Sequence, residues 1–193
     1  MNFRKMMFFT FVLGIWILPT ADTLKCYDCP PDTTKSWTES CTETIAECPE
    51  MYDQCVVTRH LFFRGGKKIT DVIFKGCAQA DVCLEKSFNF GLSKMILRSK
   101  CCTGNLCNTQ IPDYSSIPNG KKCFSCQASN CTVNCEGGED YCITARVNVG
   151  GEIRIMKGCT SKGTCDTIVN EIRKEYGVEK ISCCEGNYCN NDF

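Results

Sequence analysis

Twenty cysteines carry most of the reactive side-chain chemistry of this 193-residue chain. A thiolate can attack an electrophile, bind zinc or, in an oxidising compartment, pair with another thiol as a disulfide. The cysteines form two sets of ten, one in each half of the chain. The first set is Cys26, Cys29, Cys41, Cys48, Cys55, Cys77, Cys83, Cys101, Cys102 and Cys107, and the second is Cys123, Cys126, Cys131, Cys135, Cys142, Cys159, Cys165, Cys183, Cys184 and Cys189.

The second set largely repeats the spacing of the first. In both, two residues separate the first and second cysteines, six the fourth and fifth, and five the sixth and seventh. Seventeen residues then precede an adjacent Cys-Cys pair, and four more precede the last cysteine. A repeat of this length indicates two copies of one module, and the even count lets each module pair all of its own thiols.

Zinc binding and catalysis fit the sequence less well than disulfides do. Zinc knuckles also use Cys-x-x-Cys pairs, but the adjacent cysteines and the ten per module favour disulfides, so we expect no metal and no cofactor. Nucleophilic catalysis needs a base beside the nucleophile, and the only histidine, His60, lies within a predicted strand. We therefore expect no catalytic residues and no enzyme activity.

Residues 1–23 are predicted to be a secretory signal peptide. Arg4 and Lys5 precede an apolar run over residues 6–18, and small residues then offer a cleavage site before Leu24. The alternative, an N-terminal membrane anchor, is disfavoured because the run is short for a membrane span. No hydrophobic tail follows the last cysteine, so we expect a secreted, extracellular protein without a membrane anchor.

The charge balance argues against two classes of partner. The formal net charge of the whole chain is zero. A strongly basic chain would suggest nucleic acid or an anionic membrane surface, and neither is implied here.

Each module contains one clear β-hairpin pattern. Residues 56–63 and 69–74 flank one Gly-Gly pair, and residues 143–149 and 152–156 flank another, with apolar and β-branched residues on both sides. Residues 84–100 and 166–182 are less regular. In the second of these segments, the spacing of Ile168 and Ile172 indicates a short helical turn before a strand.

The ends of the two modules carry a resemblance to a known family. Both modules open with Cys-x-x-Cys and close with Cys-Cys-x-x-Asn-x-Cys-Asn, at residues 101–108 and 183–190. This pattern closely resembles the lymphocyte-antigen-6/urokinase-receptor (LU, Ly-6/uPAR) three-finger domain, twice, over nearly the whole mature chain. The resemblance implies a small disulfide-rich all-β fold with two tandem three-finger, snake-toxin-like LU domains. We expect these domains at residues 24–108 and 122–193, joined by a linker over residues 109–121 that is rich in turn-forming residues.

The resemblance also implies the disulfide pairing, which the spacing alone leaves open. It implies that Asn108 and Asn190 tie the terminal loop of each module to its palm by side-chain hydrogen bonds. The first finger of the second module is shorter, with four residues between its second and third cysteines against eleven in the first module. The implied pairs are Cys26–Cys55, Cys29–Cys41, Cys48–Cys77, Cys83–Cys101 and Cys102–Cys107 in the first module, and Cys123–Cys142, Cys126–Cys131, Cys135–Cys159, Cys165–Cys183 and Cys184–Cys189 in the second.

The tip of the long hairpin in the first module is the candidate contact surface. Loops on a rigid scaffold commonly carry recognition, and aromatic and basic side chains are favoured at interface hot spots. The candidate partner-binding residues are Phe62, Phe63, Arg64, Lys67 and Lys68. The simpler alternative is that the lysines are solvated and one phenylalanine packs against a neighbouring finger.

Two further features are open. The third finger of the first module is unusually apolar, which suits either a seam between the modules or a groove for a ligand; its apolar residues are Phe88, Phe90, Leu92, Met95 and Ile96. Asn130 begins an Asn-Cys-Thr sequon and is a candidate glycosylation site.

Together these patterns predict a secreted protein that binds another extracellular protein. The soluble two-module arrangement most resembles the gamma-type inhibitors of secreted phospholipase A2, which sequester the enzyme. One alternative is a urokinase-receptor-like binder of an extracellular protease or adhesion ligand. Another is a secreted signalling or reproductive factor that acts on a cell-surface receptor. Homo-oligomers are compatible with each of these.

Overall fold

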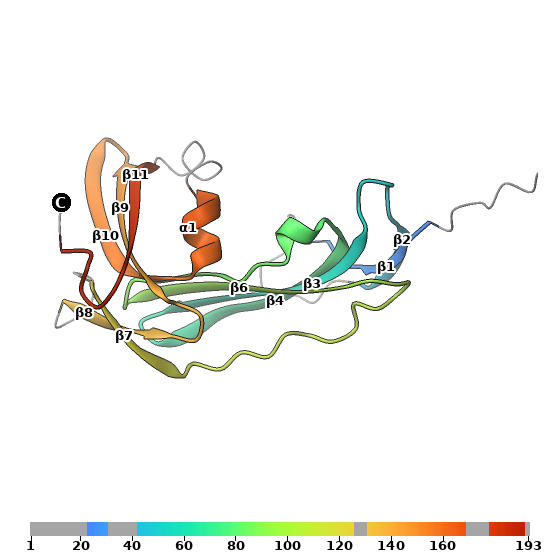
Figure 1. The fold of residues 1–193 in the computed structure, drawn as a ribbon, viewed down its shortest axis with the longest axis horizontal. Coiled ribbons are helices and arrows are strands. Elements are labelled where there is room, and N and C mark those ends of the chain that lie inside the picture. The colour runs from blue at the N-terminus through green and yellow to red at the C-terminus, as the bar shows by residue number, and fades with distance from the viewer. Residues whose placement is uncertain (1–22, 31–41, 126–130, 169–177, 192–193) are drawn as a thin grey trace, which may run out of the picture.

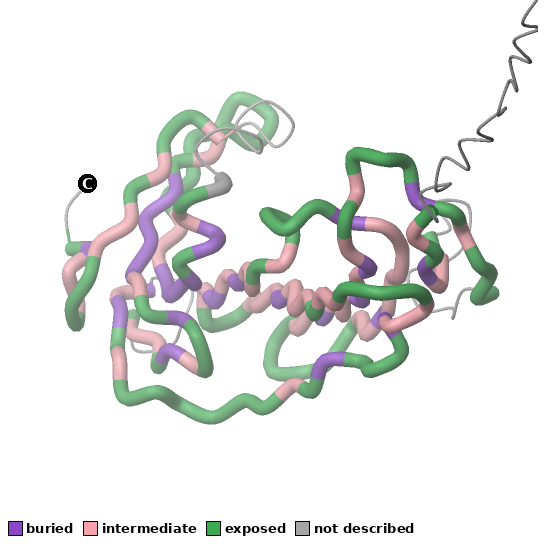
Figure 2. The backbone as a smooth tube through the Cα atoms, turned by 45° about the vertical axis from the view of Figure 1, so that its right-hand side comes forward, coloured by how far each residue is buried: buried purple, intermediate pink, exposed green. Residues whose placement is uncertain are grey.

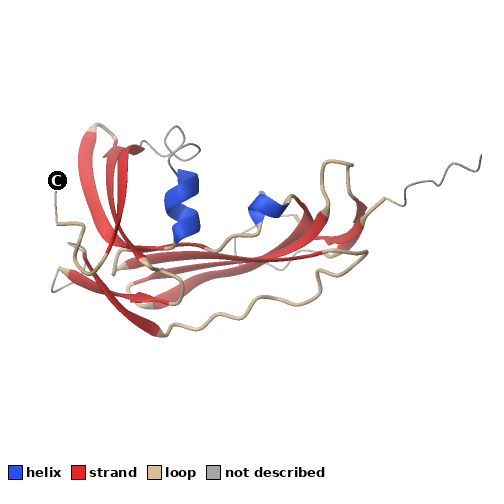
Figure 3. Cartoon of the chain, in the orientation of Figure 1, coloured by secondary structure: helices blue, strands red, loops and turns tan. Residues whose placement is uncertain are grey.

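The computed structural model describes residues 23–30, 42–125, 131–168 and 178–191. Residues 1–22 of the predicted signal peptide lie outside the described residues, as do Cys41, Cys126, Asn130 and Ile172. Strands make up most of the described chain, as expected for a small disulfide-rich all-β fold (Figure 3).

The described part of the first module contains six strands. The short strands β1 (Lys25–Asp28) and β2 (Thr44–Glu47) pair with each other in a small antiparallel sheet. The long strands β3 (Gln54–Arg64) and β4 (Lys67–Ala78) form the predicted hairpin, and its turn places both Gly65 and Gly66 at positive φ. Glycine adopts such φ values without strain, which explains the Gly-Gly pair. A 3₁₀ turn, η1 (Ala80–Val82), leads to β5 (Lys86–Asn89) and β6 (Ser93–Cys102).

The second module repeats this plan in shorter form. Strands β7 (Pro118–Phe124) and β8 (Thr132–Glu136) pair with each other, and β9 (Tyr141–Val149) and β10 (Glu152–Thr160) form the second hairpin. Helix α1 (Lys162–Ile168) precedes β11 (Val178–Glu185).

Two boundaries differ from the sequence-based expectations. Strand β7 begins at Pro118, so the last residues of the predicted linker belong to a strand of the second module. Helix α1 starts earlier than the segment for which a helical turn is indicated. Ser161, a residue type favoured before the first helical residue, lies directly in front of it and contacts the Thr164 hydroxyl group at 3.0 Å.

The two modules share one seven-stranded sheet (Figure 1). Its strand order is β11-β9-β10-β5-β6-β3-β4, so β5 of the first module pairs with β10 of the second. The pairing is short and antiparallel and joins Phe88 to Thr160 and Asn89 to Cys159. The apolar third finger thus contributes Phe88 to a seam between the modules.

Among the described residues, eight disulfides are formed, four within each module. They are Cys26–Cys55, Cys48–Cys77, Cys83–Cys101, Cys102–Cys107, Cys123–Cys142, Cys135–Cys159, Cys165–Cys183 and Cys184–Cys189. These pairs coincide with those that the resemblance implies. The sulfur atoms of Cys26, Cys48 and Cys77 lie close together, but each is bonded to another sulfur and is therefore not a thiolate ligand for zinc.

Buried cysteines form the centre of each module. Cys26, Cys48 and Cys55 make up one cluster, and Cys123, Cys135, Cys142 and Cys159 make up the other. Each disulfide typically contributes about 2–4 kcal/mol, which compensates for the small apolar core of a module of this size.

The buried residues Asn108 and Asn190 make equivalent hydrogen bonds in the two modules. The Asn108 carboxamide accepts from the Tyr27 amide at 3.0 Å and donates to the carbonyls of Tyr27 and Val56 at 2.8 and 2.9 Å. The Asn190 carboxamide accepts from the Phe124 amide and donates to the carbonyls of Phe124 and Ile143, all at 3.0–3.1 Å. Each asparagine therefore joins the end of its module to the first and middle fingers.

The described part of the chain contains no helix that is long and apolar enough to cross a membrane.

Candidate functional site at the module junction

A buried cluster of hydroxyl groups holds the two modules together beside the β5–β10 pairing. The Ser87 amide donates to the hydroxyl oxygens of Ser161 and Thr164 at 3.0 and 2.9 Å. The Thr160 hydroxyl donates to the Ser87 carbonyl at 2.8 Å. All four residues are buried. These bonds satisfy the amide and the carbonyl of Ser87, which lies next to the two residue pairs that join β5 to β10.

Two glycines allow the modules to approach this closely. A Cβ atom at Gly158 would lie 2.1 Å from the Asn89 carbonyl oxygen, and one at Gly163 would lie 2.6 Å from the Glu85 carbonyl oxygen. Both distances are shorter than van der Waals contact. The atoms contacted are backbone oxygens, which cannot move independently of their chain. The absence of a side chain at these positions is therefore a condition for the junction.

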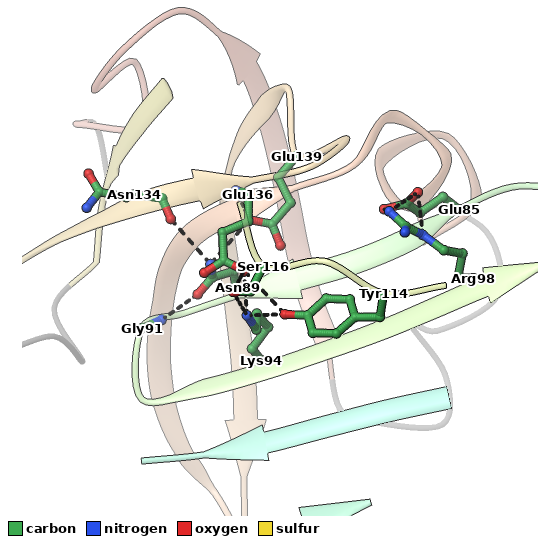
Figure 4. A network of polar contacts seen from close by, with 10 residues as sticks. All are labelled: Glu85, Asn89, Gly91, Lys94, Arg98, Tyr114, Ser116, Asn134, Glu136 and Glu139. Atoms are coloured by element: carbon green, nitrogen blue, oxygen red, sulfur yellow. Dashed lines mark hydrogen bonds and ion pairs between the residues drawn. The ribbon is translucent and has the colours of Figure 1, made fainter. Parts of the chain in front are cut away.

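Lys94 on β6 connects the first module, the linker and the second module (Figure 4). Its ammonium group donates to the Glu136 carboxylate at 2.6 Å, the Tyr114 hydroxyl at 2.7 Å and the Ser116 hydroxyl at 3.3 Å. It also lies 4.8 Å from the centre of the Phe63 ring, within cation–π range.

The contacts of Lys94 and Glu136 determine the direction in which the pKa of each group is shifted. Burial alone would lower the pKa of Lys94, but the hydrogen bonds to Glu136 and Tyr114 outweigh it and raise the pKa. Burial alone would raise the pKa of Glu136, but the bonds from Lys94 and Ser116 lower it. Both groups are therefore charged at neutral pH.

Arginines fix the linker along the same face of the first module. Arg98 forms two bonds with the Glu85 carboxylate, at 3.1 and 3.2 Å, and donates to the Asp113 carbonyl at 2.6 Å. Arg59 donates to the Pro112 carbonyl at 3.3 Å. The linker remains mostly exposed along this path (Figure 2).

Glu139 is a buried carboxylate between the modules. Its side chain is 2% exposed and accepts hydrogen bonds from the Asn89 carboxamide at 3.2 Å and the Glu136 amide at 2.9 Å. Burial raises its pKa to about 7, although both hydrogen bonds act in the opposite direction. Both donors are neutral groups, so the ionised form of Glu139 gains no paired charge to offset its burial.

The predicted tip residues are separated by the structure. Phe62 and Phe63 are neighbours on a strand and point to opposite faces of the sheet. The Phe63 ring lies 5.5 Å from that of Tyr114 in the linker, and Lys68 forms an ion pair with Asp71 at 2.6 Å. Arg64 and Lys67 are exposed beside the turn.

His60 lies in the middle of β3, opposite Val72 and Leu97 on the neighbouring strands. Burial lowers the pKa of this histidine. Its position is that of a strand side chain within the sheet, as the sequence suggests.

A groove of about 550 Å³ lies where the finger tips of the first module meet the second module. We call it the junction groove. The first module contributes the tips of two hairpins, the linker contributes Tyr114 and Ser116, and the second module contributes β8. Its lining residues include Phe63, Leu92, Tyr114, Thr132, Val133 and Asn134.

Sequence patterns gave no signal for most of this site. Lys94, Tyr114, Ser116, Glu136 and Glu139 belong to no motif, and their contacts join residues 20–50 positions apart. Of the site residues predicted from the sequence, Phe63 lies in the groove wall, and Leu92 from the apolar third finger lies there too.

The fold and this junction define a class: tandem three-finger modules, rich in disulfides, that present hairpin tips on a rigid scaffold. Comparisons with known proteins agree. Residues 22–110 match the u-PAR/Ly-6 domain, and residues 122–190 match the family of snake toxin and toxin-like proteins. Residues 22–110 therefore form a domain of the u-PAR/Ly-6 family, and residues 122–190 form a toxin-like three-finger domain.

Two kinds of relative illustrate the similarity. The urokinase plasminogen activator surface receptor of Mus musculus is 30% identical over 107 residues, covering 48% of this chain and 32% of the receptor. Ly6/PLAUR domain-containing protein 6B is 33% identical over 99 residues in Mus musculus and 32% identical over 99 residues in Homo sapiens. These matches cover 45% of this chain and 58% and 54% of the relatives, so each match spans less than two thirds of the relative's length.

The domains of this family are extracellular or cell-surface modules that bind proteins and are not enzymes.

Proposed function

We propose that this chain is a secreted, non-catalytic protein that binds and sequesters an extracellular enzyme, and that secreted phospholipase A2 is the first enzyme to test. The observation that carries the proposal is that the two modules are joined rigidly through one shared sheet. The β5–β10 pairing and the contacts of Lys94 hold finger tips of the first module against β8 of the second module in one fixed surface. A preorganised surface loses little conformational entropy on binding, which favours tight association without chemistry.

The choice of phospholipase A2 comes from the resemblance of the two-module arrangement to the gamma-type inhibitors. A second candidate, an extracellular protease, is favoured by the 30% identity to the urokinase plasminogen activator surface receptor. That receptor is, by its name, a receptor for urokinase plasminogen activator.

The test uses the full chain, expressed with its own leader in mammalian cells and recovered from the medium. Mass spectrometry would check for cleavage before Leu24, for glycosylation at Asn130 and for the absence of free thiols. The purified protein would then be titrated against a panel of secreted phospholipases A2 and against urokinase plasminogen activator, following both binding and enzyme activity.

Sub-micromolar binding to a phospholipase with loss of hydrolysis would support the first candidate. Binding to the plasminogen activator alone would support the second. Binding to neither would contradict both and would direct the search to cell-surface receptors. The variant Gly158→Ala, which disturbs the junction, should bind more weakly than the wild type, whereas Gly138→Ala is the matched control because its Cβ atom meets only ordinary contacts of 3.7 Å and longer.

A further inference from the structure

Most of the outer edge of β10 has no neighbouring strand. β10 lies between β9 and β5 in the seven-stranded sheet, but only its last two residues, Cys159 and Thr160, pair with β5. Over residues 152–158, the pairing found within the described residues is with β9 alone. The β9–β10 hairpin projects from the end of the molecule opposite to β1 (Figure 1). An edge strand of this kind presents unpaired backbone N–H and C=O groups, which form a template for another strand.

The side chains at this edge leave it open to a partner. Residues 152–155 are all exposed. Proteins commonly block such edges with proline, lysine or a β-bulge, but residues 152–156 contain neither proline nor lysine and pair with β9 without a register shift. Ile153 and Ile155 lie on one face of the strand and are 44% and 47% exposed. A second strand along this edge covers part of both isoleucines.

The charges at the edge are complementary to themselves. Glu152 and Arg154 lie on the other face of β10 and form an ion pair at 3.4 Å, with side chains that are 78% and 64% exposed. An ion pair this exposed contributes little within one chain. In an antiparallel pairing of two copies centred on Ile153, Glu152 of each copy lies directly opposite Arg154 of the other. Opposite charges in such cross-strand positions stabilise the pairing, and Ile153 meets its own copy at the centre.

The alternative registers are unfavourable. A centre at Glu152 or at Arg154 places that residue opposite the same charge in the second copy, which destabilises the pairing. A centre at Ile155 sets Gly151 of the second copy opposite Cys159, where β5 already pairs. A centre between two adjacent residues sets a residue that hydrogen-bonds to β9 opposite one that faces outward, so ladder bonds are lost. The register centred between Glu152 and Arg154 also directs the rest of the second copy beyond the hairpin turn and away from β5 of the first.

We propose that β10 pairs with β10 of a second copy of this chain, antiparallel and centred on Ile153, so that the two seven-stranded sheets become continuous. This inference goes beyond the proposed function and does not rest on it. The pairing uses residues 151–155, none of which lines the junction groove. The dimer therefore offers two junction grooves, which raises the apparent affinity for a partner that presents two binding sites.

The first test measures self-association of the full chain, expressed with its own leader in mammalian cells, by sedimentation equilibrium at low salt. We expect a reversible monomer–dimer equilibrium with a sub-millimolar dissociation constant, because an interface of two short strands is small. Glu152→Arg and Arg154→Glu should each weaken dimerisation at least tenfold, because each variant sets like charges opposite one another. A mixture of these two single variants should form a mixed dimer as tightly as the wild type does, because opposite charges then face each other again.

The matched control is Lys162→Glu, which changes the net charge by the same amount as Arg154→Glu at a 69% exposed side chain of α1. It should dimerise as the wild type does. A wild type that stays monomeric at millimolar concentration, an equal effect of Lys162→Glu and Arg154→Glu, or the absence of the mixed dimer would each overturn the inference.

A second test reads the register. In Ile153→Cys, the Cα atoms of the two introduced cysteines should lie about 5.5 Å apart, a distance that a disulfide spans, so oxidised glutathione should convert the dimer to a covalent one. In Ile155→Cys, the equivalent atoms lie four positions apart along the strands, about 13 Å, and a non-reducing gel should show no crosslinked dimer. Equal crosslinking of the two variants would contradict the Ile153-centred register. None of these measurements involves a phospholipase or a protease, so failure of this inference is distinguishable from failure of the proposed function.

Discussion

Glu139 makes the stability of the junction depend on pH. Its pKa of about 7 lies above the ordinary value of 4.5, so the folded protein holds a proton that the unfolded chain releases. The stabilising contribution of this protonation is complete below pH 4.5 and is lost as pH rises through 7. A shift of this size corresponds to a loss on the order of 3 kcal/mol across that range.

The variant Glu139→Gln should remove this dependence. The carboxamide oxygen can still accept from Asn89 and from the Glu136 amide, and the group is neutral at every pH. We expect the variant to be more stable than the wild type at pH 8 and the difference to shrink towards pH 4.5, measured by urea unfolding. His60, whose pKa is lowered by burial, contributes a slope of opposite sign in both proteins and cancels in the comparison.

The exposed residue Glu50 supplies the control. Glu50→Gln should leave the pH profile of the wild type unchanged. A parallel profile for Glu139→Gln and the wild type would show that the carboxylate is not destabilised at the junction.

Ser87 offers a second prediction for a single residue. Its hydroxyl oxygen is buried and has no hydrogen-bond partner among the residues that the structure describes, whereas the Ser87 amide and carbonyl both form hydrogen bonds. Ser87→Ala should therefore be neutral or stabilise the protein by up to about 1 kcal/mol, because it removes an unsatisfied polar atom. Thr160→Val, which deletes the hydroxyl that donates to Ser87, should cost about 1 kcal/mol. Thermal unfolding of both variants would test these expectations, and a clear loss of stability for Ser87→Ala would contradict the prediction.

Strands β5 and β10 form the weakest pairing of the seven-stranded sheet, because only two residue pairs join them. Gly158 is decisive there, since a methyl group would overlap the Asn89 carbonyl oxygen at 2.1 Å. Gly158→Ala should push the two strands apart and cost about 1–3 kcal/mol, the usual range for overpacking. Hydrogen exchange should then be faster for the amides of Ser87 and Ser161, which donate across the junction, while amides of β3 and β4 stay protected.

Gly138→Ala is the control at the same junction, because its added Cβ atom would lie 3.7 Å from the Glu85 carboxyl group. Equal exchange rates in the two alanine variants would mean that the close approach at Gly158 is not what holds the modules together.

The whole molecule should unfold as one unit, because Lys94 links the third finger, the linker and the second module. Lys94→Met leaves Glu136 without its cation in a partly buried site, and we expect a cost of about 1–3 kcal/mol. The double variant Lys94→Met/Glu136→Gln should recover part of this loss. Calorimetry should show one transition for the wild type and a broader or split transition for Lys94→Met. One sharp transition for every variant would show that the link does not couple the modules.

Patterns along the chain suffice to predict the two modules and their hairpin turns. Cysteine order and the terminal Cys-Asn pairs carry the family resemblance, and the Gly-Gly pairs mark the hairpin turns at Gly65–Gly66 and Gly150–Gly151. These features are local, because each module closes its own disulfides and each turn depends on the φ values of adjacent residues. A linear pattern can therefore express them.

The junction between the modules became visible only in the three-dimensional arrangement of the strands. The carboxylates of Glu136 and Glu139 meet Lys94 and Asn89 only because β5 and β10 pair across the module boundary. Gly158 and Gly163 occupy positions where backbones from two modules come together, and nothing in their sequence neighbourhood marks that role. Contacts between modules depend on the relative placement of two separately closed units, and spacing along one chain does not encode that placement.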